Sequence, residues 1–112
     1  MSFPQEHKMF KLQPNPTFKA PVLLSVPGED KPKEIVVEFR HQTGKQLKAY
    51  FEHIKGKTDA EAVVDLIVGW GGVDKAYSAE ALDELLDNYP VAAGEIFAAY
   101  RESALESRRK NS

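Results

Sequence analysis

The hydrophobic pattern of this chain changes once, near residue 43, and that change limits the folds that the sequence can adopt. Before it, short apolar runs are interrupted by Pro14, Pro16 and Pro21, which is typical of edge or irregular strands. After it, apolar residues recur at the spacing of amphipathic helices. The sequence therefore predicts an α+β fold, with a β-hairpin or short strands within residues 9–41 followed by about four short amphipathic α-helices.

The strand region contains a hairpin signal. The turn dipeptide Pro27-Gly28 separates two apolar runs, of which the second is rich in β-branched residues. We therefore expect a hairpin that pairs roughly residues 22–26 with residues 34–40 through a polar loop.

Capping and helix-breaking residues mark the helices. Thr58, with Glu61 after it, is a capping-box signature for the second helix, whose apolar face continues to Val68. Gly69 is expected to break this helix, and Ser78 can cap the third. The remaining boundary residues are Gly56, after the first helix, and Pro90, in the first turn of the fourth.

The apolar faces of these elements predict a single core, in one domain that spans residues 1–112. Residues 1–8 and 107–112 are expected to be flexible ends. The side chains expected to be mostly buried are Val22, Leu24, Val36, Leu47, Phe51, Val64, Ile67, Leu82, Leu86, Ile96 and Phe97.

Composition narrows the possible functions. The absence of cysteine excludes disulfide bonds, thiolate metal ligands and a cysteine nucleophile. The first residues contain no apolar signal-peptide core, and no apolar run reaches the length of a membrane span, about 18 residues. We therefore expect a cytoplasmic protein with no membrane partner.

Charge is distributed unevenly along the chain. Residues 1–57 carry a net charge of +4, residues 58–106 carry −9, and residues 107–112 carry +3. Such polarity suits head-to-tail self-association or a charged partner surface. Solvated helix faces are the plainer explanation of the same pattern, and both explanations remain open. Nucleic acid is not an expected partner, because the positive charge forms no stripe interleaved with aromatic residues.

Residues that could perform catalysis or bind a metal are scarce. None of the histidines, His7, His41 and His53, has a partner at the spacing of a helix-borne metal site. The acids Asp83, Glu84 and Asp87 are expected on the solvent side of their helix, where carboxylates keep ordinary acidity. We therefore expect no catalytic residue, no metal and no cofactor.

The glycine-rich segment Gly69 to Gly72 invites a binding-site interpretation. It does not fit a phosphate-binding loop, because a helix is expected before it and Val73 and Asp74 follow it. We expect a tight connection in which Trp70 packs on or near the core. If Trp70 is exposed instead, it would anchor a partner.

Several short motifs are spread over most of the chain in a characteristic order. They are Phe10-Lys11-Leu12, the Pro14 to Pro21 segment, Glu38-Phe39-Arg40-His41, Gly69-Trp70-Gly71-Gly72-Val73-Asp74, Tyr77-Ser78, Leu85-Leu86-Asp87-Asn88-Tyr89-Pro90, Tyr100 and Arg109-Lys110-Asn111. In their order and spacing the chain resembles the tail assembly chaperones of long-tailed bacteriophages and prophages.

The resemblance implies a non-catalytic chaperone that binds the tape measure protein in the host cytoplasm, keeps it soluble and is absent from the mature virion. It also implies self-association, and a longer form, made by a programmed frameshift, that recruits the tail tube protein. The resemblance transfers no residue role.

From the residues themselves, we predict that the partner is contacted by Trp70, Val73 and Tyr77 in the glycine-rich connection, together with the hairpin loop. A structural head–tail connector or minor tail protein remains the alternative function. A small enzyme or regulator with an unrecognised site has little support from these residues.

Overall fold

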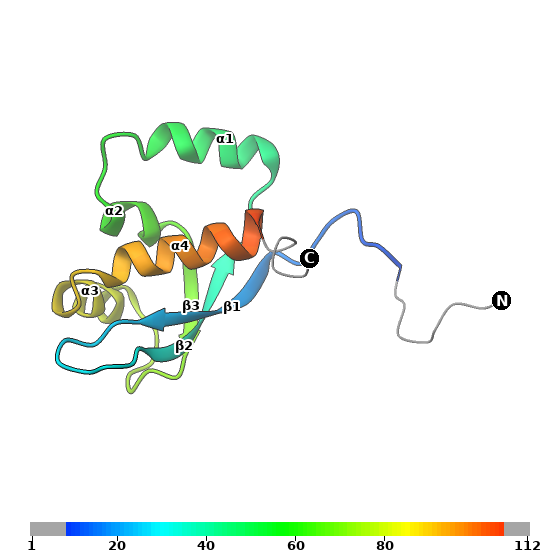
Figure 1. Ribbon diagram of the computed structural model, residues 1–112. Coiled ribbons are helices and arrows are strands. Elements are labelled where there is room, and N and C mark those ends of the chain that lie inside the picture. The colour runs from blue at the N-terminus through cyan, green and yellow to red at the C-terminus, as the bar shows by residue number, and fades with distance from the viewer. Residues whose placement is uncertain (1–8, 107–112) are drawn as a thin grey trace.

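The computed structural model describes residues 9–106 of the chain, and the predicted flexible ends, 1–8 and 107–112, lie outside this range. Within it, a three-stranded sheet and four helices confirm the predicted α+β class (Figure 1). The elements are β1 (Thr17–Leu24), β2 (Lys33–Arg40), α1 (Gly44–His53), α2 (Asp59–Val64), β3 (Ile67–Gly71), α3 (Ala79–Asn88) and α4 (Ala92–Leu105).

The predicted hairpin is confirmed. β1 and β2 pair antiparallel in a register that runs from Thr17 opposite Arg40 to Leu24 opposite Lys33. β1 therefore begins earlier than the expected residue 22 and includes Pro21. Since β1 is an edge strand, a proline in it need not interrupt the ladder with β2.

The second helix is shorter than predicted, and the expectation of a tight connection at Gly69 to Gly72 is wrong. α2 ends at Val64, and Ile67–Gly71 forms β3, which pairs antiparallel with β2, Trp70 lying opposite Val37. The physical reason is that β2 would otherwise leave one row of backbone groups without partners. Apolar and β-branched residues before Trp70 suit a strand as well as a helix.

Helix α4 covers one face of the sheet, and α2 and α3 pack beside α4 (Figure 1). The side chains that join the helix to the sheet include Tyr100, which is 1% exposed, and Ile96, which is fully buried. The ring of Tyr100 meets that of Phe39 on β2 edge to face, with centroids 5.4 Å apart. This helix-on-sheet layer forms the core.

The predicted core is correct in part. Val22, Leu24, Ile67, Leu82 and Ile96 are buried, and Leu47, Leu86 and Phe97 are half-buried. The expectation is wrong for Val36, Phe51 and Val64, which are 38%, 36% and 51% exposed.

Each error in the core has a local cause. Val36 lies between the buried Ile35 and Val37, so the alternation of strand side chains turns it to the face opposite α4. Helix α2 has six residues and buries Ala62 and Val63 rather than Val64. In α1, Tyr50 is the buried aromatic, and its hydroxyl donates to the Ala62 carbonyl at 2.8 Å, which leaves Phe51 outside.

The predicted helix caps are present. Thr58 and Glu61 form a complete capping box at α2, and the hydroxyl of Ser78 accepts a hydrogen bond from the Ala81 backbone N–H at α3. Pro90 lies just before Val91, the N-cap of α4, rather than inside the first turn as predicted.

Candidate functional site

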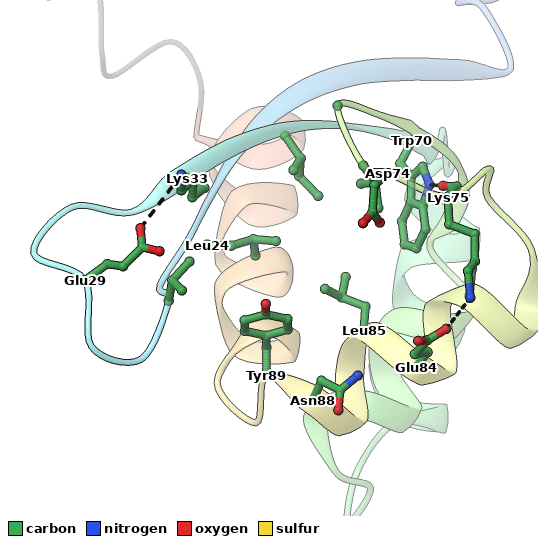
Figure 2. A pocket seen from close by; sticks show the side chains of 15 residues that line it. Leu24, Glu29, Lys33, Trp70, Asp74, Lys75, Glu84, Leu85, Asn88 and Tyr89 are labelled. Carbon is green, nitrogen blue, oxygen red and sulfur yellow. Dashed lines mark hydrogen bonds and ion pairs between the residues drawn. The ribbon is translucent and has the colours of Figure 1, made fainter.

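A groove lies between the hairpin loop, the connection that follows β3, and helix α3 (Figure 2). Its volume is about 660 Å³. The apolar side chains that line it are Leu24, Val26, Ile35, Trp70, Val73, Ala81, Leu85 and Tyr89; Asn88 is polar, and the charged ones are Glu29, Lys33, Asp74, Lys75 and Glu84. The groove is therefore an apolar trough with charges along its walls.

The connection after β3 forms one wall, and Trp70 braces it. The indole is half-buried, and its Nε1–H donates a hydrogen bond to the Lys75 carbonyl at 2.8 Å. The ring of Tyr77 packs edge to face against it, with centroids 5.2 Å apart. Trp70 therefore packs on the core and also lines the groove, so the two alternatives that the sequence left open for this residue are both partly realised.

A glycine lets this wall approach the hairpin. Gly72 has φ 84°, in the left-handed region that favours glycine. A Cβ at this position would lie 3.6 Å from the Cα of Ile35, so the space is also limited. The chain can thus turn closely beside β2 and carry Val73 and Asp74 into the groove.

The hairpin loop, which forms the opposite wall, is tied to helix α4. The backbone N–H of Ser25 donates to both carboxylate oxygens of Glu95, at 3.1 and 3.2 Å, and its hydroxyl donates to the same carboxylate. Ser25 follows directly after Leu24, a groove residue. These bonds fix the end of β1 relative to the first turn of α4.

Most charges around the groove are paired. Lys33 and Glu29 approach to 3.8 Å, and Lys75 and Glu84 to 2.7 Å. The hydrogen bond to the Glu84 carboxylate, together with its charge, raises the pKa of Lys75 above its ordinary value. Both pairs are largely exposed, so they contribute little to the stability of the fold and mainly determine the charge around the groove.

Asp74 differs from these paired groups. Within residues 9–106 its side chain forms no hydrogen bond or salt bridge, although its charge helps to raise the pKa of the neighbouring Lys75. Figure 2 shows its carboxylate pointing into the groove. The groove therefore presents a third carboxylate in addition to those of Glu29 and Glu84.

The structure brings two of the three predicted contact residues into the groove. Trp70 and Val73 line it, together with the hairpin loop, whereas Tyr77 lies behind Trp70 and donates its hydroxyl to the Ile67 carbonyl at 3.2 Å. Sequence reasoning did not assign Leu85 and Tyr89 to a site. The apolar face of α3 could have indicated them, because only some of its side chains are buried in the core.

The polar groups outside the groove lie apart from one another or have structural partners. Within residues 9–106, no three His, Asp or Glu side chains gather as they would around a metal ion. Burial raises the pKa of the Tyr50 and Tyr100 hydroxyls, which are held by hydrogen bonds with Ala62 and Gln42. Among the described helices, none has both the length and the apolar character needed to cross a bilayer.

An open, partly apolar groove with a few charged groups at its walls is the kind of surface at which proteins bind other molecules. A family model described as phage tail assembly chaperone matches residues 7–111 of the 112. The chain belongs to the phage tail assembly chaperone family. No curated protein and no solved structure matches the chain.

Proposed function

We propose that this chain binds the tape measure protein of its own phage in the host cytoplasm and keeps it soluble during tail assembly, without catalysing a reaction. The groove between the hairpin, the β3–α3 connection and α3 is the proposed docking place. The observation that carries this proposal is an apolar groove that is open to solvent and lies beside charged residues. The tail assembly family of the chain supplies the class of partner.

The argument rests on what a tape measure protein exposes before the tail tube surrounds it. The family resemblance implies a long helical partner, and a long amphipathic helix without a partner exposes an apolar stripe that promotes aggregation. An amphipathic helix docks in a groove through apolar anchors, while charges at the rim orient it. Leu85 and Val73 would contact the stripe, and the ion pairs Lys33–Glu29 and Lys75–Glu84 would lie beside it.

The predicted contact residues take different roles in this proposal. Trp70 and Val73 contact the partner directly, because they line the groove. Tyr77 acts through Trp70, whose ring it supports. All three side chains are only partly exposed, so we expect a modest affinity per copy, on the order of micromolar, or about −8 kcal/mol.

A modest affinity suits a chaperone that must later be displaced from its partner. Several copies along one long partner would hold it through high effective concentration, while each copy stays releasable. Tail tube subunits would then displace the chaperone, so the chain would be absent from the mature virion. A longer form, made by frameshift, would recruit the tail tube protein through its additional C-terminal part.

Co-expression with the tape measure protein tests the proposal. The wild-type chain should move the partner into the soluble fraction and co-purify with it in several copies. Val73→Asp, which places a charge in the groove, should reduce both effects, whereas Leu23→Asp, on the exposed sheet face, should retain them. A tape measure protein that is equally insoluble with and without the chain would contradict the proposal. In that case, the chain in purified virions would identify a connector or minor tail protein.

A further inference from the structure

A second hollow lies between the start of α1, the last turn of α4 and the start of β1, with a volume of about 200 Å³. No acidic residue lines it, and its apolar and aromatic lining residues are Phe18, Leu47, Tyr100, Ala104 and Leu105. Leu105 is 46% exposed, so part of this lining faces water. We call this hollow the end pocket. It is smaller than a typical small-molecule site, of about 300–1,000 Å³, and has room for one large apolar side chain.

The end pocket is separate from the groove. Leu24, at the end of β1, lines the groove, whereas Phe18, near the start of the same strand, lines the end pocket. These two positions are about 20 Å apart along the strand. Figure 1 shows the hairpin loop and α3 at one end of the sheet and the last turn of α4 at the other. A partner in one site therefore leaves the other site open.

Helix α1, which forms one wall of the end pocket, lies in the basic part of the chain. Residues 1–39 contain five Lys/Arg and five Asp/Glu, so the net charge of +4 in residues 1–57 comes entirely from residues 40–57. Lys45 and Lys48 lie in the first two turns of α1, on either side of Leu47 in sequence. Both are exposed, and within residues 9–106 neither forms a hydrogen bond or an ion pair. The helix that lines the pocket thus carries two cations that the described chain does not pair.

The position of Lys45 does not favour the stability of its own helix. Thr43 caps α1, so Lys45 lies in the first turn, where the positive end of the helix dipole disfavours a cation. In the described chain, α1 is the only helix whose first turn contains no acidic residue. It also buries a single residue, Tyr50, and Figure 1 shows it set apart from the sheet. A cation that weakens a loosely packed helix is typical of a residue kept for binding rather than for stability.

Charge and size together define the occupant of the end pocket. One apolar side chain fits the pocket, and carboxylates beside that side chain would meet Lys45 and Lys48. Terminal segments of this chain have the wrong charge. Phe10 and Leu12, the exposed apolar residues before β1, flank Lys11, and residues 107–112 carry a net charge of +3. Like charges repel, so the fitting occupant is an acidic segment of another protein.

We propose that the end pocket binds an acidic protein segment through one large apolar side chain. Leu47 and Leu105 contact this anchor, and Lys45 and Lys48 lie beside the carboxylates that flank it. The apolar anchor supplies most of the affinity, while the exposed lysines speed the encounter and select an acidic partner. The chain then has two docking sites of different chemistry, one at each end of the sheet. This proposal concerns a site other than the groove and does not depend on the proposed tape measure partner.

Fluorescence anisotropy of a labelled acidic peptide, titrated with the full chain, tests the proposal. The probe has a central phenylalanine between aspartate and glutamate residues. One comparison peptide has serine in place of the phenylalanine, and the other has lysine in place of the acids. The probe should bind the wild-type chain, and both comparison peptides should bind at least about tenfold more weakly. Added salt should weaken binding of the probe, because the lysines are exposed.

Variants of the chain locate the site. Lys45→Glu/Lys48→Glu reverses the charge on α1, and Leu105→Ser removes an apolar lining residue, so each should weaken binding of the probe by at least about tenfold. Lys19→Glu/Lys31→Glu is the matched control. It makes the same change in net charge at two exposed lysines elsewhere, and it should bind the probe as the wild type does.

Two further measurements separate this role from a structural one and from the groove. Lys45→Glu places an acid in the first turn of α1, so the variant should bind the probe more weakly while its melting temperature is equal to or above that of the wild type. Val73→Asp changes the groove alone and should retain binding of the probe.

Several results would overturn the proposal. They are a wild-type chain that does not bind the probe, equal binding of the peptides with and without phenylalanine, and a loss in Lys19→Glu/Lys31→Glu as large as that in Lys45→Glu/Lys48→Glu. Sedimentation of the wild type tests the remaining occupant. Self-association that Lys45→Glu/Lys48→Glu abolishes would assign the end pocket to a second copy and would also overturn the proposal.

Discussion

The indole Nε1–H of Trp70 donates a hydrogen bond to the Lys75 carbonyl across the turn that follows β3, with the two atoms 2.8 Å apart. This bond closes the connection upon itself and sets the position of Val73 and Asp74, which lie between the two residues in sequence. Trp70 therefore shapes the groove as well as lining it.

Replacing Trp70 by Phe tests this bracing role. The substitution keeps an aromatic ring against Tyr77 but removes the donor to Lys75, so we expect a loss of about 1 kcal/mol in the free energy of unfolding. Urea denaturation measures the loss, and Tyr77→Phe, which removes the bond to the Ile67 carbonyl, serves as a comparison. Unchanged stability in Trp70→Phe would show that the hydrogen bond to Lys75 does not stabilise the connection after β3.

Burial distinguishes two substitutions in the helical layer. Ile96→Ala should lower the free energy of unfolding by about 2–5 kcal/mol, because Ile96 is fully buried between α4 and the sheet. Leu86 is only half-buried, so Leu86→Ala should cost less than Ile96→Ala. Chemical denaturation of both variants checks the order. The reverse order would contradict the placement of α4 on the sheet.

The capping box of α2 predicts a pH dependence. The backbone N–H of Thr58 donates to Glu61, and this bond is the main reason that the pKa of Glu61 lies below its ordinary 4.5. A lowered pKa in the folded state means that the box stabilises the fold above the unfolded pKa and loses this contribution as the pH falls through the folded pKa.

The measurement for Glu61 is the free energy of unfolding between about pH 5 and pH 3. Glu61→Gln keeps an acceptor for the Thr58 N–H but does not ionise, so the variant should lose less stability than the wild type over this interval. Identical pH profiles for the two proteins would show that the cap does not couple to ionisation.

The sequence predicted those elements whose signals are local. The hairpin was recognisable from the turn at Pro27-Gly28, and the start of α2 from Thr58 and Glu61, because turn and capping residues act over a few positions. β3 was not predicted. Its residues follow α2 in a continuous apolar run that fits the period of a helix, and only the unpaired edge of β2, far earlier in the chain, selects the strand.

The candidate site was predictable to a smaller degree. Trp70 and Val73 were identified because a large aromatic residue in a glycine-rich segment is unusual, and the structure places both in the groove. Leu24 and Leu85 come from distant elements, and no local pattern shows that they face each other. Asp74 could not be distinguished from other surface acids until its neighbours Lys75 and Glu84 were seen to be paired.

The single tryptophan of the chain provides a direct test of the central claim, because Trp70 lines the groove and reports on its occupancy. A helical tape measure fragment that lacks tryptophan is titrated into the wild-type chain while Trp70 emission is recorded. Docking in the groove should shift the emission to shorter wavelength with a dissociation constant on the order of micromolar, and Val73→Asp should weaken the response. Unchanged emission at fragment concentrations that saturate binding by calorimetry, or no binding at all, would contradict the account.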